Sequence, residues 1–338
     1  MEFRKYGSIE NSYRIQFTDL IKSKGLHAGE YIVQEKVHGA NFSFWCDGNY
    51  VRCAKRTSFL SGEEEQKFNG AAQVLKDHYQ KIMMLFQNVK AIHGDLETLT
   101  LCGELIGGQY PHPDVKRVEH AVKVQKGVYY CPHNIFYGFD ILVNGKLLEQ
   151  RITNMFFESS GIFHAKTIFS GTFDECLQYP NAFDSHIPGW LGLPSIADNV
   201  CEGTIIRPNI PVFLGNGSRV ILKNKNEKWE EKSKEQSRAP KIADPMTGDT
   251  LEAFHKISEY VTENRLKNVL SKLGPVTNKD FGKLSGMFNA DVIEEFNKEH
   301  NDFNVLDKSE RKRVTKEMSR ATALIIRENF LNIIDGEF

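Results

Sequence analysis

Short apolar segments of strand-like composition recur through the first two thirds of the chain, and each contains charged residues. The segments and their charged residues are 31–36 with Glu35 and Lys36, 101–108 with Glu104, 136–143 with Asp140, 201–208 with Glu202 and Arg207, and 219–225 with Lys223 and Lys225. A charge inside an apolar strand costs free energy unless it is solvated or has a partner. The segments therefore predict strands whose charged side chains are either solvated or have a partner, such as a ligand.

Turn residues and the spacing of apolar residues indicate the fold class. Asp47-Gly48 separates two β-prone runs, and Asn144-Gly145 follows another, as in antiparallel hairpins. Residues 63–92 and the chain from 251 onward have apolar residues at helical spacing. We expect an α+β fold, with antiparallel sheets and flanking helices in residues 1–240 and a small all-α domain in residues 241–338.

Composition sets few limits on function. The chain has 338 residues, 40% of them hydrophobic, and a net charge of −1. Any nucleic-acid contact must therefore depend on local clusters of basic residues. Residues 219–241 contain eight basic residues against four acidic ones. This segment is either a solvated connection or a basic lip for a nucleic-acid backbone.

The six cysteines are scattered and form no C-x-x-C pair, which favours reduced thiols in an intracellular protein. No apolar leader opens the sequence, and no window approaches a membrane span. We expect a cytoplasmic or nuclear location without a signal or transit peptide, or the host-cell cytoplasm if the gene is viral, and no contact with membranes.

Lys36 is the candidate nucleophile. A lysine amine has a reference pKa of about 10.4, so attack on an electrophile requires nearby positive charge or metal. Arg56, Lys223 and Lys225 supply such charge later in the chain. Gly39 suits a turn close to a phosphate.

Other polar groups suit a nucleotide ligand. His38 and Asn41 offer neutral hydrogen-bonding groups for phosphate or ribose. Glu104 is either a residue at a sheet edge or an acceptor for a ligand hydroxyl. Phe139, directly before Asp140, has a ring suited to stacking on a base.

The order of the motifs K-x-x-G-x-N, A-K-R-T, C-G-E-L-x-G, F-Y-x-F-D-I, E-G-x-x-x-R-P and L-K-x-K resembles that of the covalent nucleotidyltransferases. It is most similar to the RNA ligase 2 family, which includes phage RNA ligases and the RNA-editing ligases of kinetoplastids. Residues 5–11, 260–269 and 279–283 also look like the phage member, so the resemblance covers nearly the whole chain.

The resemblance implies a ligase-type nucleotidyltransferase domain and a role for each matched residue. Lys36 would form lysyl-AMP, the backbone around Glu35 and Val37 would contact adenine, and Asn41 and Arg56 would meet phosphate. Glu104 would accept from the ribose hydroxyls, and Phe139 and Ile205 would sandwich the adenine. Glu202 would help to hold the metal, and Lys223 and Lys225 would bind the α-phosphate. Asp140 and His38 are expected among the catalytic residues. His38 is either a base or a neutral phosphate contact.

Two residues depart from the phage pattern. Arg207 stands where the phage enzyme has lysine, and Ala40 stands where it has threonine. Arginine keeps the cation but changes its geometry, which leaves the role of Arg207 open. Ala40 removes only a hydroxyl that the chemistry does not need.

The implied activity is ATP-dependent joining of RNA 3′-hydroxyl and 5′-phosphate ends, with Mg²⁺ or alternatively Mn²⁺, in RNA repair or editing. The expected partners are RNA ends, with a nicked duplex as the expected substrate. The helical tail, with polar residues such as Asn264, Arg265, Lys267 and Asn268 expected at its surface, would engage the RNA end. The alternatives are an ATP-dependent DNA ligase or a GTP-dependent mRNA-capping guanylyltransferase, which normally append a β-barrel instead of helices. A non-catalytic RNA-binding protein is disfavoured because the lysine and the motif carboxylates are all present.

Overall fold

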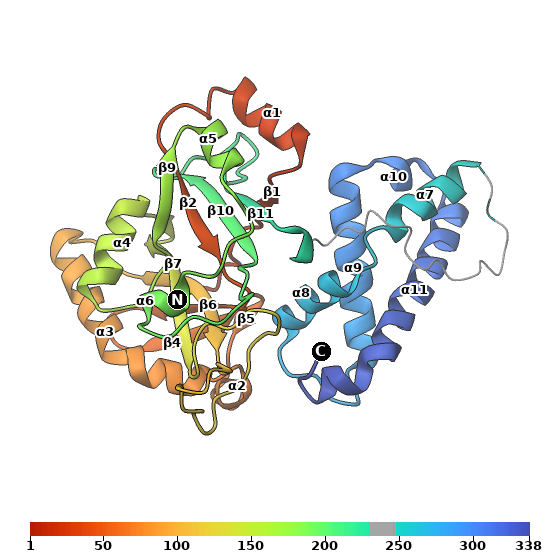
Figure 1. The fold of residues 1–338 in the computed structure, drawn as a ribbon. Helices are drawn as coiled ribbons and strands as arrows, with labels where there is room; N and C mark the ends of the chain where they lie inside the picture. The colour runs from red at the N-terminus through yellow and green to blue at the C-terminus, as the bar shows by residue number, and fades with distance from the viewer. Residues whose placement is uncertain (230–245, 247) are drawn as a thin grey trace. The chain divides into compact units, whose positions relative to one another are not determined.

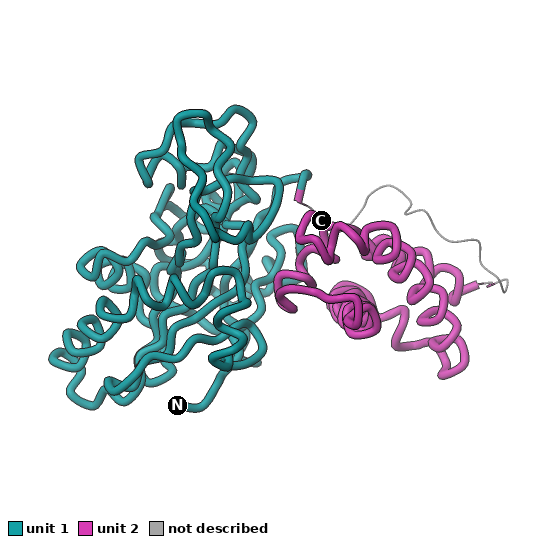
Figure 2. Tube along the Cα trace, turned by 90° about the horizontal axis from the view of Figure 1, so that it is seen from below, with its two compact units in different colours: residues 1–228 teal, residues 229–338 magenta. Residues whose placement is uncertain are grey.

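A computed structural model describes residues 1–229, 246 and 248–338 of the chain. The chain forms two compact units, Met1–Lys228 and Trp229–Phe338 (Figure 2). The expected domain boundary between residues 240 and 241 lies outside the described residues. So do residues 230–241 of the basic segment.

The first unit contains two sheets, and the chain is α+β as expected (Figure 1). The first sheet has the order β1-β11-β10-β2-β9. Its strands are β1 Glu10–Asn11, β2 Tyr31–Lys36, β9 Thr167–Gly171, β10 Gly203–Pro208 and β11 Leu222–Lys225. All of its pairings are antiparallel except β1 with β11.

The second sheet is antiparallel throughout and has the order β5-β4-β3-β6-β7-β8. Its strands are β3 Ala40–Cys46, β4 Val51–Lys55, β5 Ser58–Phe59, β6 Leu99–Gly107, β7 Asn134–Val143 and β8 Lys146–Leu147. Both predicted hairpins are confirmed. Asn144 and Gly145 have φ of 50° and 78°, the left-handed backbone that a two-residue turn requires.

Helices cover one face of each sheet in this unit. They are α1 Ile15–Ser23, α2 Gly62–Lys67, α3 Ala71–Ile92, α4 Gln150–Ser159, α5 Phe173–Gln178 and α6 Ile187–Trp190, with a 3-10 turn at Glu227–Trp229. Phe42, Phe44 and Leu105 of the second sheet pack with residues of α3. Tyr31 and Val33 of the first sheet pack with Phe173 of α5.

Side chains alternate between the two faces of a strand. Asn41 and Glu104 therefore lie on the face of the second sheet opposite α3. Lys36, Ile205 and Lys225 lie on the face of the first sheet opposite α5. Glu104, Lys36 and Lys225 thus face away from the helix-covered cores. Glu35 alternates with Lys36 and lies on the α5 face of β2.

The single helix predicted over residues 63–92 is wrong at one point. The helical run stops at Lys67 and restarts at Ala71, because Asn69 and Gly70 adopt left-handed φ of 49° and 77°. The apolar residues of the predicted helical face pack inward, since Val74, Ile82 and Phe86 are buried in the core of this unit.

The regular elements described in the second unit are all helices. Its helices are α7 Gly248–Ser258, α8 Glu263–Leu273, α9 Phe281–Glu299, α10 Asp302–Val305 and α11 Lys308–Ile334. They enclose a separate core that includes Phe254, Leu266, Phe288 and Met318.

All six cysteines are buried free thiols, in agreement with the sequence-based expectation. Among the described helices, none combines the length and the apolar character needed to cross a bilayer.

Candidate active site

Lys36, at the end of β2, lies beside a buried carboxylate. Its Nζ is 2.7 Å from Glu202 Oε2, and Lys225 Nζ is 2.8 Å from the other oxygen, Oε1. Register explains the meeting, because Gly203 of β10 pairs with Lys36 on one side and with Lys225 on the other. Three predicted site residues from distant parts of the sequence thus form one cluster, which we call the lysine cluster (Lys36, Glu202, Lys225).

Glu202 is only 1% exposed and ionised. Burial opposes its ionisation, but Lys225 and Lys36 outweigh that effect and hold its pKa at about 2. His38 Nδ1 lies 3.8 Å from Glu202 Oε2, and the His38 backbone N–H donates to the Tyr130 hydroxyl at 2.8 Å. His38 therefore borders the lysine cluster.

Glu104 forms the opposite side of the site, on β6. Desolvation raises its pKa to about 7, with Lys36 lowering and Glu202 raising it, and Arg56 also favours its ionised form. Asn41 of β3 is its cross-strand neighbour. Glu104 thus lies within electrostatic reach of the lysine cluster and is poised between its neutral and ionised forms near neutral pH.

Two glycines permit this geometry. A Cβ at Gly39 would lie 2.5 Å from the Leu105 carbonyl oxygen and 2.8 Å from Glu104 Oε2. The structure thus gives a different reason for Gly39 from the expected phosphate approach: it lets the chain pass against β6. Gly203 has φ of 146°, and its Cβ would lie 2.1 Å from the Asn224 carbonyl oxygen.

The Glu35 carboxylate is not part of the lysine cluster and has other hydrogen-bond donors. Ser185 Oγ donates to it at 2.6 Å, and the His186 backbone N–H donates at 2.9 Å. Burial nevertheless raises the pKa of Glu35 to about 7. Its backbone carbonyl accepts from the Tyr137 hydroxyl at 3.3 Å, and the neighbouring Val37 is buried.

Tyr130, Ser185 and His186 contact site residues but were not predicted. Tyr130 and Ser185 lie in loops, and His186 directly precedes the four-residue α6. They belong to no periodic pattern or matched motif. The one available signal is Tyr130-Cys131-Pro132, a short unassigned apolar run before β7.

The proposed adenine-binding pair lies on two different sheets. Ile205 of β10 is cross-strand from Lys223 of β11, and both are partly exposed. Phe139 is the extra residue at a bulge in β7, since Cys102 pairs with Asp140 while Gly103 pairs with Gly138. The Phe139 ring contacts the Tyr6 ring edge-on, with centroids 5.2 Å apart.

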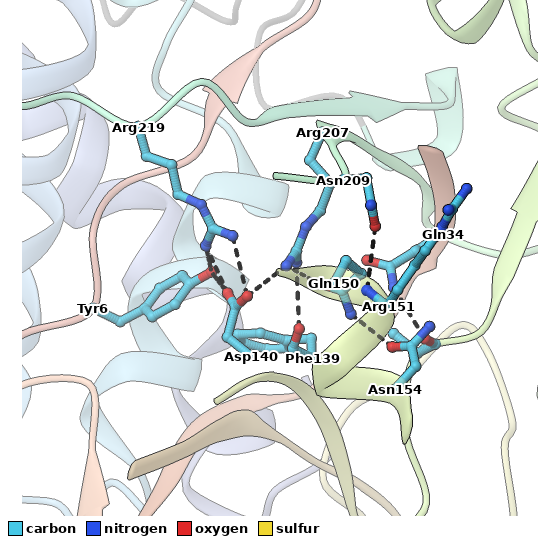
Figure 3. Close-up of polar contacts among 11 residues, drawn as sticks. Tyr6, Gln34, Phe139, Asp140, Gln150, Arg151, Asn154, Arg207, Asn209 and Arg219 are labelled. Atoms are coloured by element: carbon cyan, nitrogen blue, oxygen red, sulfur yellow. Dashed lines mark hydrogen bonds and ion pairs between the residues drawn. The ribbon is translucent and has the colours of Figure 1, made fainter. Parts of the chain in front are cut away.

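Asp140 lies in a buried polar network, shown in Figure 3, and we find no interaction with Lys36 among the described contacts. Its carboxylate accepts from Arg207 at 2.5 Å, from Arg219 at 2.6 Å and from the Tyr6 hydroxyl at 2.5 Å. Although burial opposes ionisation, the two arginines hold the Asp140 pKa at about 2. The network joins β7 of one sheet to β10 of the other.

Arg207 occupies the position where the phage pattern has lysine, and both of its terminal nitrogens donate hydrogen bonds. Besides Asp140, it donates to the Phe139 carbonyl at 3.3 Å and to Gln150 at the start of α4. Arg219, expected in a strand and a basic lip, precedes β11 and is almost entirely buried in this network. A lysine could not reach all of these acceptors with one ammonium group.

In the second unit, Arg265 is not at the surface. It is 1% exposed, its Nη1 lies 3.1 Å from Asp291 Oδ2, and its Nε donates to the Tyr260 carbonyl. Its expected position at the surface is therefore wrong. The sequence pattern failed here because a buried ion pair has the same composition as a solvated helix face.

Among the described residues, no group of three or more His, Cys, Asp or Glu side chains could enclose a metal ion. Mg²⁺ with nucleotides uses one or two carboxylates and completes its shell with phosphates and water. The carboxylates of Glu202 and Glu104 beside the lysine cluster fit that requirement.

Comparison with known proteins adds sequence relationships to this geometry. A family model described as RNA ligase matches residues 29–225, and a model described as T4 RNA ligase 2 C-terminal matches residues 245–323. The chain is 25% identical to the mitochondrial RNA-editing ligase 2 of Trypanosoma brucei brucei over 88% of this chain and 83% of that protein.

Two further matches cover less of the proteins concerned. RNA-editing ligase 1 of the same organism is 29% identical over 61% of this chain, and the match spans only half of that ligase. A mutant of the Naegleria gruberi RNA ligase, solved with ATP and Mn, superposes with a TM-score of 0.45 at 14% identity, over 67% of this chain and 57% of that one.

Proposed function

Because the chain belongs to the RNA ligase family, we propose that it is an ATP-dependent RNA ligase that joins 3′-hydroxyl and 5′-phosphate ends. The observation that supports this best is the lysine cluster. A buried Glu202 holds the candidate nucleophile Lys36 and the phosphate-binding candidate Lys225 on its two oxygens. Two amines held side by side suit the binding of an α-phosphate and its leaving group.

In the first step, the Lys36 ammonium leaves its ion pair with Glu202 and gives a proton to solvent, and the neutral amine attacks the α-phosphorus of ATP. A phosphorus–nitrogen bond forms, the bond to pyrophosphate breaks, and the amine loses a proton. Lys225 and Lys223 offset negative charge on the phosphates. Bound Mg²⁺, held by Glu202 with Glu104 nearby, would supply further charge neutralisation.

The nucleoside lies between the two sheets in this proposal. Glu104 accepts from the ribose hydroxyls, and the pKa of about 7 means that it is largely ionised only above neutral pH. Phe139 and Ile205 contact the two faces of adenine, while the backbone beside Glu35 and Val37 contacts its edge. Asn41 and Arg56 complete the phosphate contacts.

We assign Asp140 a positioning role instead of a place in the chemistry. Its ion pair with Arg207 connects β7 to β10, the strands on which Phe139 and Ile205 lie. Its ion pair with Arg219 connects β7 to the segment before β11. His38 is a neutral phosphate contact or a proton acceptor beside Glu202.

In the later steps, an oxygen of an RNA 5′-phosphate attacks the lysyl-AMP phosphorus, and the bond to Lys36 breaks as its amine regains a proton. A 3′-hydroxyl then attacks the activated 5′-phosphate, and AMP leaves. The RNA ends of a nicked duplex are the proposed substrate. The helical second unit, whose residues 245–323 match the T4 RNA ligase 2 C-terminal model, is proposed to engage the RNA.

The alternatives fit less well. DNA ligases and capping enzymes normally place a β-barrel after the lysine pair, whereas the described part of the second unit contains helices and no strand. The relatives in the sequence comparison are named as RNA-editing ligases.

The direct test measures which nucleotide labels the protein and which nucleic-acid ends the protein joins. The protein is incubated with α-labelled ATP or α-labelled GTP, and then with nicked RNA or nicked DNA duplexes. The proposal expects covalent labelling by ATP and joining of RNA. Labelling by GTP alone would support a capping enzyme, and equal joining of DNA would support a DNA ligase.

A further inference from the structure

The longest helix, α11 (Lys308–Ile334), has a strongly basic outer face. Lys312, Arg313, Lys316, Arg320 and Arg327 are all exposed, and we call them the basic stripe. At 3.6 residues per turn they project within about 100° of arc. Between Lys312 and Arg327 the only other residue in that arc is Ala323, so the stripe itself contains no carboxylate and no aromatic ring.

The stripe lies opposite the buried side of the helix. Val314 and Met318, which are fully buried in the core of the second unit, project to the far side of α11 from Lys316. The length from Lys312 to Arg327 is about 22 Å at 1.5 Å per residue. Packing of this helix therefore holds a row of cations in a fixed line.

Within the part of the chain that the structure describes, other lysines of this unit have carboxylate partners that two lysines of the stripe lack. Lys256 contacts both Glu252 and Asp302, and Lys298 contacts Glu294 and Glu295. Among the described residues, Lys312 and Lys316 have no such ion pair. In the stripe, Arg320 pairs with the buried Glu317, and the Arg327 guanidinium lies 5.9 Å from the Phe281 ring.

The Phe281 contact also extends the surface. Phe281 begins α9, between the exposed Lys279 and Lys283, and packs against Phe330 of α11 at 5.2 Å. From Lys312 to Arg320 the row contains no aromatic side chain, which suits a rigid phosphate backbone better than unstacked bases.

We propose that the basic stripe of α11 binds the phosphate backbone of the duplex portion of the RNA substrate, without sequence preference. This inference rests on the proposed RNA ligase function and names the surface that performs the RNA engagement. It involves no residue of the nucleotide site.

The test compares binding of a nicked RNA duplex at several salt concentrations. In the full-length chain, Lys312, Lys316 and Arg327 are changed to Gln, while Arg320 is kept because it neutralises Glu317. The expected result is an affinity about tenfold weaker at physiological salt and a slope of log affinity against log salt reduced by roughly 2 to 3. Formation of enzyme-AMP is expected to be unchanged.

Two control variants test whether the loss of RNA affinity is specific to the charges of the basic stripe. Lys24→Gln, Lys76→Gln and Lys90→Gln together remove the same charge from exposed positions of the first unit and are expected to leave RNA affinity near wild type. The charge-preserving set Lys312→Arg, Lys316→Arg and Arg327→Lys is expected to retain binding, and thermal melting checks that each variant is folded.

An affinity and salt slope equal to wild type in the folded Gln variant would overturn the proposal. So would equal loss in the scattered-charge control, which would mean that net charge alone matters. The wild-type protein is assayed for RNA joining in parallel, so failure of the proposal for the basic stripe is distinguishable from failure of the proposed function. Wild-type protein that neither forms enzyme-AMP nor joins RNA would contradict the proposed function and, with it, the proposal for the basic stripe.

Discussion

At the scale of single residues, the site depends on carboxylates with opposite electrostatic surroundings. Glu202 contacts two lysines and keeps a pKa of about 2, whereas Glu35 has neutral hydrogen-bond donors and a pKa of about 7. Burial opposes ionisation of both, so the different outcome comes from their partners. Glu202 remains charged throughout the neutral range, while Glu35 changes its protonation within it.

The raised pKa of Glu35 predicts a pH dependence of stability. A group whose pKa is higher in the folded state stabilises the fold below its unfolded pKa, and this contribution is lost as pH rises through the folded value. For Glu35 that window runs from about 4.5 to about 7. Relative to wild type, Glu35→Gln is therefore expected to become more stable as pH rises from 5 to 8.

Melting temperatures of both proteins across that range check this. Glu97→Gln, at an exposed position, serves as the control. A difference between Glu35→Gln and wild type that stays constant with pH would refute the account of the Glu35 environment.

At the scale of elements, the β10–β11 pairing depends on Gly203. A Cβ there would lie 2.1 Å from a backbone oxygen of β11, and φ of 146° is unfavourable for other residues. Gly203→Ala is expected to displace β11, separate Lys225 from Glu202 and reduce enzyme-AMP formation by at least about tenfold.

Gly189→Ala is the matched control, because a Cβ at Gly189 has no atom within 4 Å. Labelling with α-labelled ATP, together with circular dichroism, measures both variants. Equal labelling of the two would show that the close approach at Gly203 does not position the site.

The network around Asp140 makes a second prediction at this scale. Asp140→Asn leaves the buried Arg207 and Arg219 without their shared carboxylate. Breaking a buried ion pair on one side costs about 3–5 kcal/mol, and denaturant unfolding measures it. Arg151→Lys, which alters an exposed pair with Glu30, is expected to cost under about 1 kcal/mol. A loss for Asp140→Asn as small as that of Arg151→Lys would contradict a stabilising role.

The positions of the strands were more predictable from the sequence than the ion pairs of the buried charged residues. Alternation and turn residues are local signals, so β2 and the hairpin of β3 and β4 followed directly from the sequence. The break at Asn69-Gly70 was missed because apolar spacing continues across it. The Arg219–Asp140 and Arg265–Asp291 pairs were missed because they join residues that are far apart in sequence, and composition does not distinguish buried charges from solvated ones.

At the scale of the whole molecule, the residues assigned to nucleotide chemistry all lie within Met1–Lys228. A chain ending at Lys241 is therefore expected to form enzyme-AMP but to join 5′-phosphate RNA much more slowly. Loss of RNA positioning can cost several orders of magnitude in rate. Single-turnover joining of nicked RNA by the truncated and full-length chains measures the effect. Equal rates would remove the second unit from the reaction.

The central claim is that AMP passes from ATP to Lys36, then to an RNA 5′ end, and leaves when the ends are joined. One pulse–chase experiment with α-labelled ATP follows all three transfers. The account predicts that the label first appears on the peptide containing Lys36, then moves to added 5′-phosphate RNA, and is released as AMP when the nick closes. The Lys36→Arg variant, whose guanidinium stays charged, is expected to acquire no label. Label on a different lysine, or label on Lys36 that never moves to RNA, would contradict it.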